Sequence, residues 1–431
     1  MMPDYVYTYP PRQAFARLDP NLCTDASLAR ALTQTPLNFN VYVHVPFCRQ
    51  ICGFCNLYAI AGKNTLAVFE PYVDAVLSEL RQYYAMLGEQ DCRTVYIGGG
   101  TPALMPVNLL DRLITGIENV FPGARLKTTE LCLEAAPEVL DSTTAREWRS
   151  LGITRLSLGS QSFNSVELRT LGRRHDPFVT ANAIDSCLSL GFPDVCVDLI
   201  NGLPDQTRES WVTSVATVAK IRPPTICTYN LTSRPVTGFH LRQLALPDER
   251  ERYHRYSLAQ DLILSAGYHQ ETNVRYVIPG VGGYRQKINH WAGGTILGLG
   301  LGSRTYTPTL HYQCHSGSVA QRPSALAAYM DPSRTARRPL MGFILSPEEQ
   351  VRRALALNAH SLTRATLLAA AESGLHEQVS ETYDYLVSNG LAVRKADDVC
   401  FTDSGHAYRD IISHSFFSPQ VRERSRTYKY A

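Results

Sequence analysis

Short apolar segments rich in β-branched residues recur through the first half of the chain. They occupy residues 40–47, 94–99, 131–136, 154–159, 194–200 and 226–231. Each segment has the length of a strand, and helical patterns fill the gaps between most of them. Strands that alternate with helices are typical of parallel βα units, so the pattern predicts an α/β fold. Six units predict a full or partial (β/α)6 barrel, and periodicity alone leaves a doubly wound open sheet as the alternative.

One of these gaps carries a clear helical stripe. Its apolar residues at helical spacing are Val73, Val76, Leu77, Leu80, Tyr84 and Leu87. Side chains three or four positions apart share one face of a helix. The gap is therefore predicted to be an amphipathic helix with one side against the sheet.

The pattern changes twice farther along the chain. Glycine-rich stretches at 280–286 and 298–303 predict that the segment 232–335 is irregular. The run Ser-Pro-Glu-Glu at 346–349 has the form of a capping box with proline at the first helical position, and residues 386–405 indicate a helix, a turn and a small hairpin. We predict four parts: an N-terminal arm (1–36), a barrel core (37–235), an extension with substrate loops (236–335) and a small winged-helix-like domain (336–431).

Charge and hydropathy argue against two kinds of partner. The chain has 42 basic and 39 acidic residues, so its net charge of +3 gives no electrostatic reason to expect nucleic acid. No apolar run is long enough for a membrane-spanning helix. The start MMPDYVYTYPPR lacks the cationic and apolar stretches of a secretory signal. We therefore expect a cytoplasmic protein with no nucleic-acid or membrane partner.

Most of the cysteines are predicted to be ordinary core residues. The chain has eleven of them, and a disulfide framework does not suit a reducing compartment. Those that stand alone in apolar segments include Cys132, Cys196 and Cys227. Isolated thiols of this kind behave as small buried apolar side chains.

Three cysteines differ, because Cys48, Cys52 and Cys55 form a C-x3-C-x2-C group directly after the first predicted strand. Thiolates are the usual ligands of iron–sulfur clusters. Three ligands for a [4Fe–4S] cluster leave one iron open, and the candidate ligand there is the amine and carboxylate of S-adenosylmethionine (SAM). A structural zinc site usually needs two C-x2-C pairs, and the sequence has no second pair. The spacing therefore predicts a [4Fe–4S] cluster.

The motifs around this group resemble a known family. They are YVHVPFC (42–48), YIGGGTP (96–102), LEAAP (133–137), RLSLGSQSF (155–163), LGRRH (171–175), VDLINGLPDQT (197–207), SAGY (265–268) and GLGLGS (298–303). In this order, over about residues 37–310, they resemble the radical SAM superfamily and its oxygen-independent coproporphyrinogen III oxidase group. The resemblance implies a partial (β/α)6 radical SAM barrel, an irregular extension and a winged-helix-like domain. It also implies that the cluster cleaves SAM to a 5′-deoxyadenosyl radical, with an electron donor such as flavodoxin or ferredoxin.

The same resemblance implies which residues hold the amino-acid end of SAM. The backbone of the glycine turn would bind its amino group, since glycine lets a ligand approach closely. The turn consists of Gly98, Gly99, Gly100 and Thr101. Glu134, at the end of a predicted strand, would bind the same end of SAM. His44 is expected to be a buried structural histidine, and no catalytic residue is assigned.

Five further residues complete the implied SAM site. Arg173 would bind the carboxylate of SAM, because a guanidinium suits a bidentate carboxylate. Gln161 and Asp198 would contact the ribose. Tyr42 and Phe54 would pack near the cluster and the adenine.

Departures from the family narrow the predicted function. The coproporphyrinogen oxidases carry a fourth cysteine where this chain has Leu57, and the haem-chaperone branch carries a histidine after the later glycines where this chain has Ser303 and Arg304. The start YVYTYPPRQAF resembles the class C radical SAM methylases, which bind two SAM molecules, and Arg304 falls where the second is expected. We therefore predict a class C enzyme that methylates or cyclopropanates an sp² carbon of a small-molecule or carrier-bound natural product. The alternatives are a tetrapyrrole enzyme (coproporphyrinogen dehydrogenase-like or an anaerobic haem-degrading methylase) and a non-catalytic haem chaperone.

Overall fold

All six predicted strands are present and parallel. The computed structural model describes residues 5–34, 39–62, 65–121, 130–315, 318–333 and 339–428. The six strands are β2 (Phe39–Val45), β5 (Cys92–Gly99), β6 (Glu130–Ala135), β7 (Arg155–Gln161), β8 (Asp194–Asn201) and β9 (Thr225–Asn230). Each pairs in parallel with the next in this order. The prediction of an α/β fold with a partial radical SAM barrel is confirmed.

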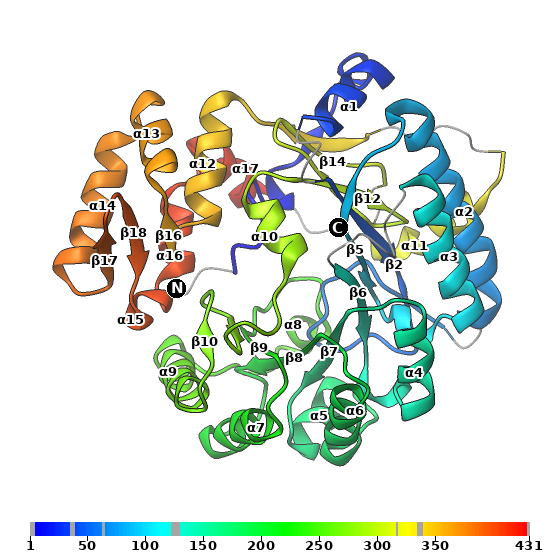
Figure 1. Ribbon diagram of the computed structural model, residues 1–431, viewed down its shortest axis with the longest axis horizontal. Coiled ribbons are helices and arrows are strands. Elements are labelled where there is room, and N and C mark those ends of the chain that lie inside the picture. The colour runs from blue at the N-terminus through cyan, green and yellow to red at the C-terminus, as the bar shows by residue number, and fades with distance from the viewer. Residues whose placement is uncertain are drawn as a thin grey trace.

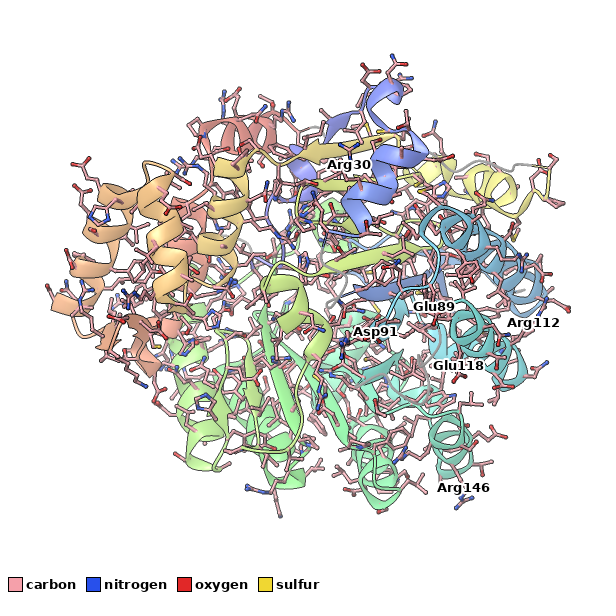
Figure 2. The ribbon with its side chains drawn as sticks, turned by 45° about the horizontal axis from the view of Figure 1, so that its top comes forward. Arg30, Glu89, Asp91, Arg112, Glu118 and Arg146 are labelled. Carbon is pink, nitrogen blue, oxygen red and sulfur yellow. The ribbon has the colours of Figure 1, made fainter. Side chains whose placement is uncertain are left out.

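Helices cover the outer face of this curved sheet (Figure 1). They are α2 (Thr65–Leu87), α3 (Val107–Val120), α4 (Ser142–Ser150), α5 (Ser165–Leu171), α6 (Pro177–Ser189) and α7 (Arg208–Ile221). In α2, the first four residues of the predicted stripe are buried, whereas Tyr84 is exposed. Charged side chains such as Arg112 of α3 and Arg146 of α4 project outward, from the sides of their helices that face away from the sheet (Figure 2). The helices are therefore amphipathic.

The extension is more regular than predicted. Its helices are α8 (Gly238–Leu241), α9 (Glu249–Ser265), α10 (Arg285–Trp291) and α11 (Arg322–Met330). The sequence of α9 shows no clear helical stripe, because its buried face includes the polar residues Arg255 and Gln260 among apolar ones. The expectation of an irregular segment at 232–335 is therefore wrong for much of its length.

Strands from the extension also enlarge the sheet. They are β10 (His269–Gln270), β11 (Arg275–Val277), β12 (Thr295–Leu299), β13 (Thr305–Tyr306) and β14 (Leu310–Gln313), joined by β1 (Ala16–Arg17) and β15 (Met341–Ile344). Strand β12 pairs in parallel with β2, and β11 pairs antiparallel with β9. The largest sheet in the described part of the chain thus has thirteen strands and runs from β1 to β10.

The C-terminal elements gather at one side of the sheet (Figure 1). They are α12 (Pro347–Leu357), β16 (Ser361–Leu362), α13 (Arg364–Glu372), α14 (His376–Ser388), β17 (Ala392–Lys395), β18 (Asp398–Phe401), α15 (Asp403–His406), α16 (Arg409–Ser415) and α17 (Pro419–Thr427). The predicted hairpin is β17–β18, and β16 completes a three-stranded sheet. The predicted domain boundaries at 36–37 and 335–336 lie outside the described residues, so the division into domains stays a prediction.

Half of the predicted capping box is present. The Ser346 hydroxyl accepts a hydrogen bond from the Glu349 N–H at 3.2 Å. The Glu349 carboxylate instead accepts from the hydroxyl of Tyr9 in the N-terminal arm. The arm thus ties itself to the first C-terminal helix, and Val6 and Tyr9 share an apolar core with α12–α17.

The described helices include none that combines the length and the hydropathy needed to cross a membrane.

Candidate functional site

The three predicted cluster ligands lie on one loop between β2 and α2. The loop begins at β3 (Phe47–Cys48), where Cys48 is buried, and Cys52 and Cys55 are half-buried. The Cys55 N–H donates to the Cys52 carbonyl at 3.0 Å. The Gly53 N–H donates to the Leu171 carbonyl at 3.2 Å, and the Gly53 carbonyl accepts from Phe239 N–H at 2.8 Å. Backbone bonds to two other parts of the fold therefore hold the loop.

The chemistry of these cysteines fits a [4Fe–4S] cluster. The sulfur atoms of Cys48, Cys52 and Cys55 do not all lie within 4.8 Å of one another, which is the spacing expected around a single ion. Wider spacing suits ligands that bind different irons of one cluster. Burial raises the pKa of the Cys55 thiol to about 11, so bound iron would have to draw off its proton. These residues would hold the cluster, which supplies an electron to SAM when both are bound.

The glycine turn after β5 lies directly against the cluster loop. The Gly100 N–H donates to the Val45 carbonyl at 2.8 Å, and the Thr101 hydroxyl lies 3.7 Å from the Cys48 sulfur as a donor. A Cβ atom added to Gly100 would lie 2.8 Å from that sulfur. Only glycine leaves this space free, so the turn and Cys48 are fitted to each other.

Glu134 faces the same turn from β6. Its carboxylate accepts hydrogen bonds from the Gly99 N–H and the Tyr96 hydroxyl, both at 2.8 Å. Burial raises the pKa of Glu134 to about 7, although these two bonds oppose the shift. A cationic ammonium group would favour the ionised carboxylate. The geometry therefore suits the predicted contact with the SAM amino group, and the contact itself stays a prediction.

Gln161 and Arg173 approach each other over Gly159 on β7. A Cβ atom on Gly159 would lie 2.8 Å from the Gln161 side-chain nitrogen and 3.4 Å from an Arg173 guanidinium nitrogen. Gln161 ends the strand with φ of 71°, a left-handed conformation that is rare outside glycine. Arg173 lies 4.0 Å from the Glu138 carboxylate, whose other oxygen is 2.8 Å from His175. The negative charge of Glu138 thus offsets part of the positive charge of Arg173 that a SAM carboxylate would meet.

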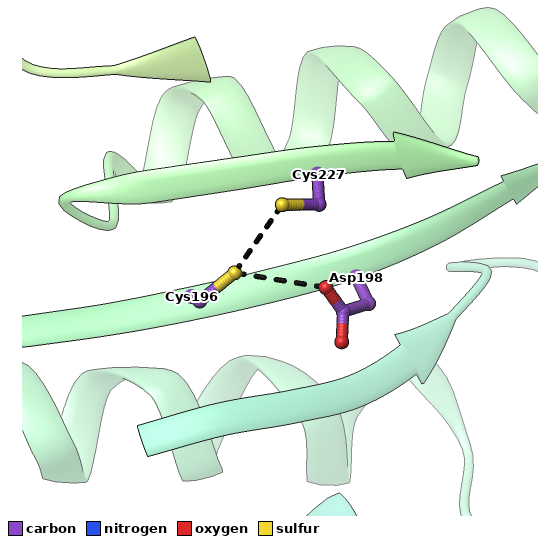
Figure 3. Close-up of side chains that lie close together, drawn as sticks. All are labelled: Cys196, Asp198 and Cys227. Carbon is purple, nitrogen blue, oxygen red and sulfur yellow. Dashed lines mark hydrogen bonds between the residues drawn. The ribbon is translucent and has the colours of Figure 1, made fainter. Parts of the chain in front are cut away.

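Asp198 has neighbours that the sequence did not indicate. The Cys196 thiol lies 3.6 Å from an Asp198 oxygen and 3.5 Å from the Cys227 sulfur (Figure 3). The Ser157 hydroxyl donates to the other Asp198 oxygen at 3.2 Å. Burial raises the pKa of Asp198 to about 6. The prediction that Cys196 and Cys227 are buried is confirmed, but the expectation that they are isolated core residues is wrong, because β8 and β9 bring them together.

The two predicted aromatic residues lie in different places. Tyr42 stacks on Tyr96 at 5.8 Å, and its hydroxyl lies 3.1 Å from His44 Nδ1. His44 is also bonded to the Tyr58 carbonyl at 2.8 Å, and burial lowers its pKa to about 4, which agrees with a structural role. Phe54 instead packs on an apolar group that includes Phe239. The adenine contacts of both residues stay predictions.

The sequence did not indicate that the N-terminal arm helps to line this part of the barrel. The Tyr7 carbonyl accepts from the Trp291 indole at 3.1 Å. The Lys287 side-chain nitrogen donates to the Tyr5 hydroxyl and lies 4.4 Å from the centre of the Trp291 ring. Burial lowers the pKa of Lys287 well below its usual value. The alternating tyrosines of YVYTY were the available signal, but their partners Lys287 and Trp291 lie in α10, far away in the sequence.

Arg304 lies in the same neighbourhood. Burial raises the pKa of Tyr7, and the nearby charges of Arg304 and Glu134 also act on this phenol. The pKa of Arg304 is raised, chiefly by the nearby phenol of Tyr306, and Tyr42 acts in the same direction. The structure thus brings Arg304 close to the predicted SAM residues, while its role toward a second SAM stays a prediction.

Comparisons with known proteins agree with the predicted superfamily. The Radical SAM superfamily model matches residues 42–218. A haem chaperone HemW of Escherichia coli K12 is 30% identical over 264 residues, which cover 61% of this chain and 69% of the relative. HemW of Mycobacterium tuberculosis is 33% identical over 274 residues, covering 62% and 69% of the two chains. HemW of Synechocystis is 27% identical over 409 residues, covering 88% and 96%.

A solved structure extends the likeness to the whole fold. Coproporphyrinogen III oxidase HemN of Escherichia coli superposes with a TM-score of 0.77 and covers 96% of this chain and 97% of its own. The two chains are 19% identical, so this likeness concerns the fold.

These matches contradict the predicted class C methylase or cyclopropanase of natural products, because the named relatives are haem chaperones. That prediction depended on the short segment 5–15 and on departures at single positions, whereas the likeness to the chaperones extends over most of the chain. The shared motifs imply a [4Fe–4S] cluster and SAM, as predicted. The chain belongs to the radical SAM superfamily and, within it, to the coproporphyrinogen-oxidase-like group of HemW and HemN.

Proposed function

We propose that this protein is a haem-binding member of its group that carries haem rather than converting it. The observation that carries the proposal is the match to the Synechocystis haem chaperone, which extends over 88% of this chain and 96% of the relative. A shared substructure such as the barrel alone would explain a match over the core but not over nearly the full length.

The site geometry supports a cluster and SAM in the same protein. The loop of Cys48, Cys52 and Cys55 lies against the glycine turn, and Glu134 accepts from that turn at 2.8 Å. The proposal includes one SAM molecule at the cluster. The second SAM that the sequence led us to expect is tested by the ratio of SAM to protein at saturation. An electron donor such as flavodoxin or ferredoxin and a cytoplasmic location complete the proposal.

The test combines haem binding with SAM cleavage. Anaerobically reconstituted protein is mixed with haemin, with SAM and reductant, and with both. The proposal expects a haem absorption band and little 5′-deoxyadenosine. The absence of haem binding would refute it. SAM cleavage stimulated by a porphyrin would instead support a tetrapyrrole enzyme.

A further inference from the structure

Two cysteines and an aspartate meet on the inner face of the barrel sheet. Cys196 and Asp198 lie two positions apart on β8, and Cys227 lies on the neighbouring β9. Successive side chains of a strand point to opposite faces of the sheet. Val197 belongs to the main apolar core beneath the helices, so Cys196 and Asp198 face the interior. Cys227 is in register with Asp198, which brings the three side chains together (Figure 3).

The three ligand atoms have the spacing of a tetrahedral metal site. Cys196 Sγ lies 3.5 Å from Cys227 Sγ and 3.6 Å from Asp198 Oδ1, and the three ligand atoms all lie within 4.8 Å of one another. Two zinc–sulfur bonds of about 2.3 Å at the tetrahedral angle separate their sulfurs by about 3.8 Å, and the same bonds in line would need about 4.6 Å. The observed spacing therefore matches tetrahedral rather than linear coordination.

The donor set suits a soft divalent cation. Thiolates select zinc over magnesium or calcium, and a carboxylate can complete such a set. Cys196 and Cys227 are 1% and 3% exposed, which keeps water away from the sulfurs. Asp198 is half-buried, so a cation can reach the group on this side. The other Asp198 oxygen accepts from the Ser157 hydroxyl at 3.2 Å, which orients the carboxylate.

A buried guanidinium offsets the charge that an occupied site would carry. Two thiolates, one carboxylate and a divalent cation sum to one negative charge. Burial raises the pKa of Asp198, and the hydrogen bond to Cys227 raises the pKa of Cys196, whereas the charge of Arg155 opposes both shifts. An ion pair with Asp194 at 2.8 Å holds Arg155 in place. Arg155 thus favours the ionised groups that a cation needs as ligands.

We propose that Cys196, Cys227 and Asp198 bind one zinc-like divalent cation on the inner face of the barrel. Binding replaces the two thiol protons with two metal–sulfur bonds and leaves the oxidation states unchanged. Three protein ligands leave the fourth tetrahedral position for water or a bound molecule. The second oxygen of Asp198 stays available for the predicted ribose contact. This site uses none of the loop cysteines, and it does not depend on the proposed haem binding.

The first test is a zinc analysis of the anaerobically reconstituted protein, in which the cluster occupies the loop cysteines. The protein is incubated with zinc chloride, desalted and analysed by mass spectrometry for zinc. The inference expects about one zinc per chain in wild type and in the control Cys187→Ala, which removes a buried thiol of α6. Cys196→Ala and Cys227→Ala should each bind zinc at least about tenfold more weakly. Wild type without zinc, or equal binding in Cys196→Ala, would overturn the site.

X-ray absorption at the zinc edge identifies the ligands separately from iron. The wild-type spectrum should show two sulfurs at about 2.3 Å and oxygen ligands at about 2.0 Å. Three sulfurs would place the zinc on the cluster loop, and a shell of nitrogen and oxygen alone would place it on the surface. Either result would overturn the site without affecting the proposed function.

A further variant tests the carboxylate. Asp198→Asn keeps the shape of the side chain, so the fold should persist, as circular dichroism can verify. Loss of the negative charge should weaken zinc binding at least about tenfold while the two sulfurs remain in the absorption spectrum. Wild-type zinc affinity in Asp198→Asn would overturn the three-ligand site.

Discussion

Two walls of the barrel interior are built in different ways. We call the strands β5 and β6 with the cluster loop the motif wall, and β8, β9 and α10 with the N-terminal arm the assembled wall. On the motif wall, Gly99 bonds to Glu134 and Thr101 lies against Cys48, so partners come from neighbouring βα units. On the assembled wall, Lys287 donates to the hydroxyl of Tyr5, a residue far away from it in the sequence. Local motifs therefore specify the first wall, whereas tertiary packing specifies the second.

The largest expected effect is on the motif wall. Changing Cys48, Cys52 and Cys55 together to alanine should abolish the cluster, because each thiolate would hold a different iron. Wild-type protein should bind about four irons per chain after anaerobic reconstitution, and the triple variant should lack the brown absorption. Iron analysis and visible spectra measure the change.

The control for this experiment is Cys187→Ala. Cys187 is buried in α6 and belongs to the main core. It should keep full iron content and lose on the order of 1 kcal/mol of unfolding free energy. Retention of iron in the triple variant, or its loss in a folded Cys187→Ala, would contradict the three-ligand model.

The second effect tests the assembled wall. Arg409 is fully buried and donates to the Val6 carbonyl at 2.7 Å and the Leu357 carbonyl at 2.8 Å. Arg409→Ala should lower the unfolding free energy by about 3–5 kcal/mol, because it leaves two buried carbonyls and Asp410 without this partner. Arg394→Ala, at an exposed pair with Asp384, should change it by less than about 0.5 kcal/mol. Similar denaturation midpoints for both variants would show that the arm is not held in this way.

The same contrast explains what the sequence could predict. The six strands and the cysteine loop carry signals within short stretches, such as alternating apolar runs and the C-x3-C-x2-C spacing. Helix α9 carries no clear stripe, because Arg255 and Gln260 are buried on it. The pairing of β12 with β2 and the contacts of Tyr5 join distant segments, so no local pattern encodes them. The resemblance to a methylase failed because it depended on local departures within a widely shared fold.

The third effect concerns the contact between the cluster loop of the motif wall and helix α8. In Gly53→Ala, the new Cβ would lie 2.3 Å from the Phe239 ring and 3.0 Å from the Arg242 guanidinium. Because the ring is packed in an apolar group, relief requires a backbone shift, and we expect a loss of about 1–3 kcal/mol. Gly62→Ala is the matched control, since a Cβ there meets nothing within 4 Å. Urea denaturation of both variants measures the difference, and equal stability would refute the tight contact.

The smallest expected effect is a pH dependence that originates on the motif wall. Burial raises the pKa of Glu134 from 4.5 to about 7, so between these values the folded protein binds more protons than the unfolded chain. The stability that this group contributes is therefore highest below pH 4.5 and falls as the pH rises toward 7. Glu134→Gln should flatten this part of the stability profile, whereas Glu147→Gln on the exposed side of α4 should leave it unchanged.

Adding SAM should reverse the trend if Glu134 pairs with its ammonium group. The ligand then favours the carboxylate, so SAM affinity should increase as the pH rises through about 7, the pKa to which burial raises Glu134. Calorimetric titrations at several pH values measure this slope in wild type and Glu134→Gln. A SAM affinity that is independent of pH in wild type would remove Glu134 from the SAM site. The hydrogen bonds from Gly99 and Tyr96 would then mark Glu134 as a brace for the glycine turn, and the motif wall would resemble the assembled wall in using a buried charge for packing alone.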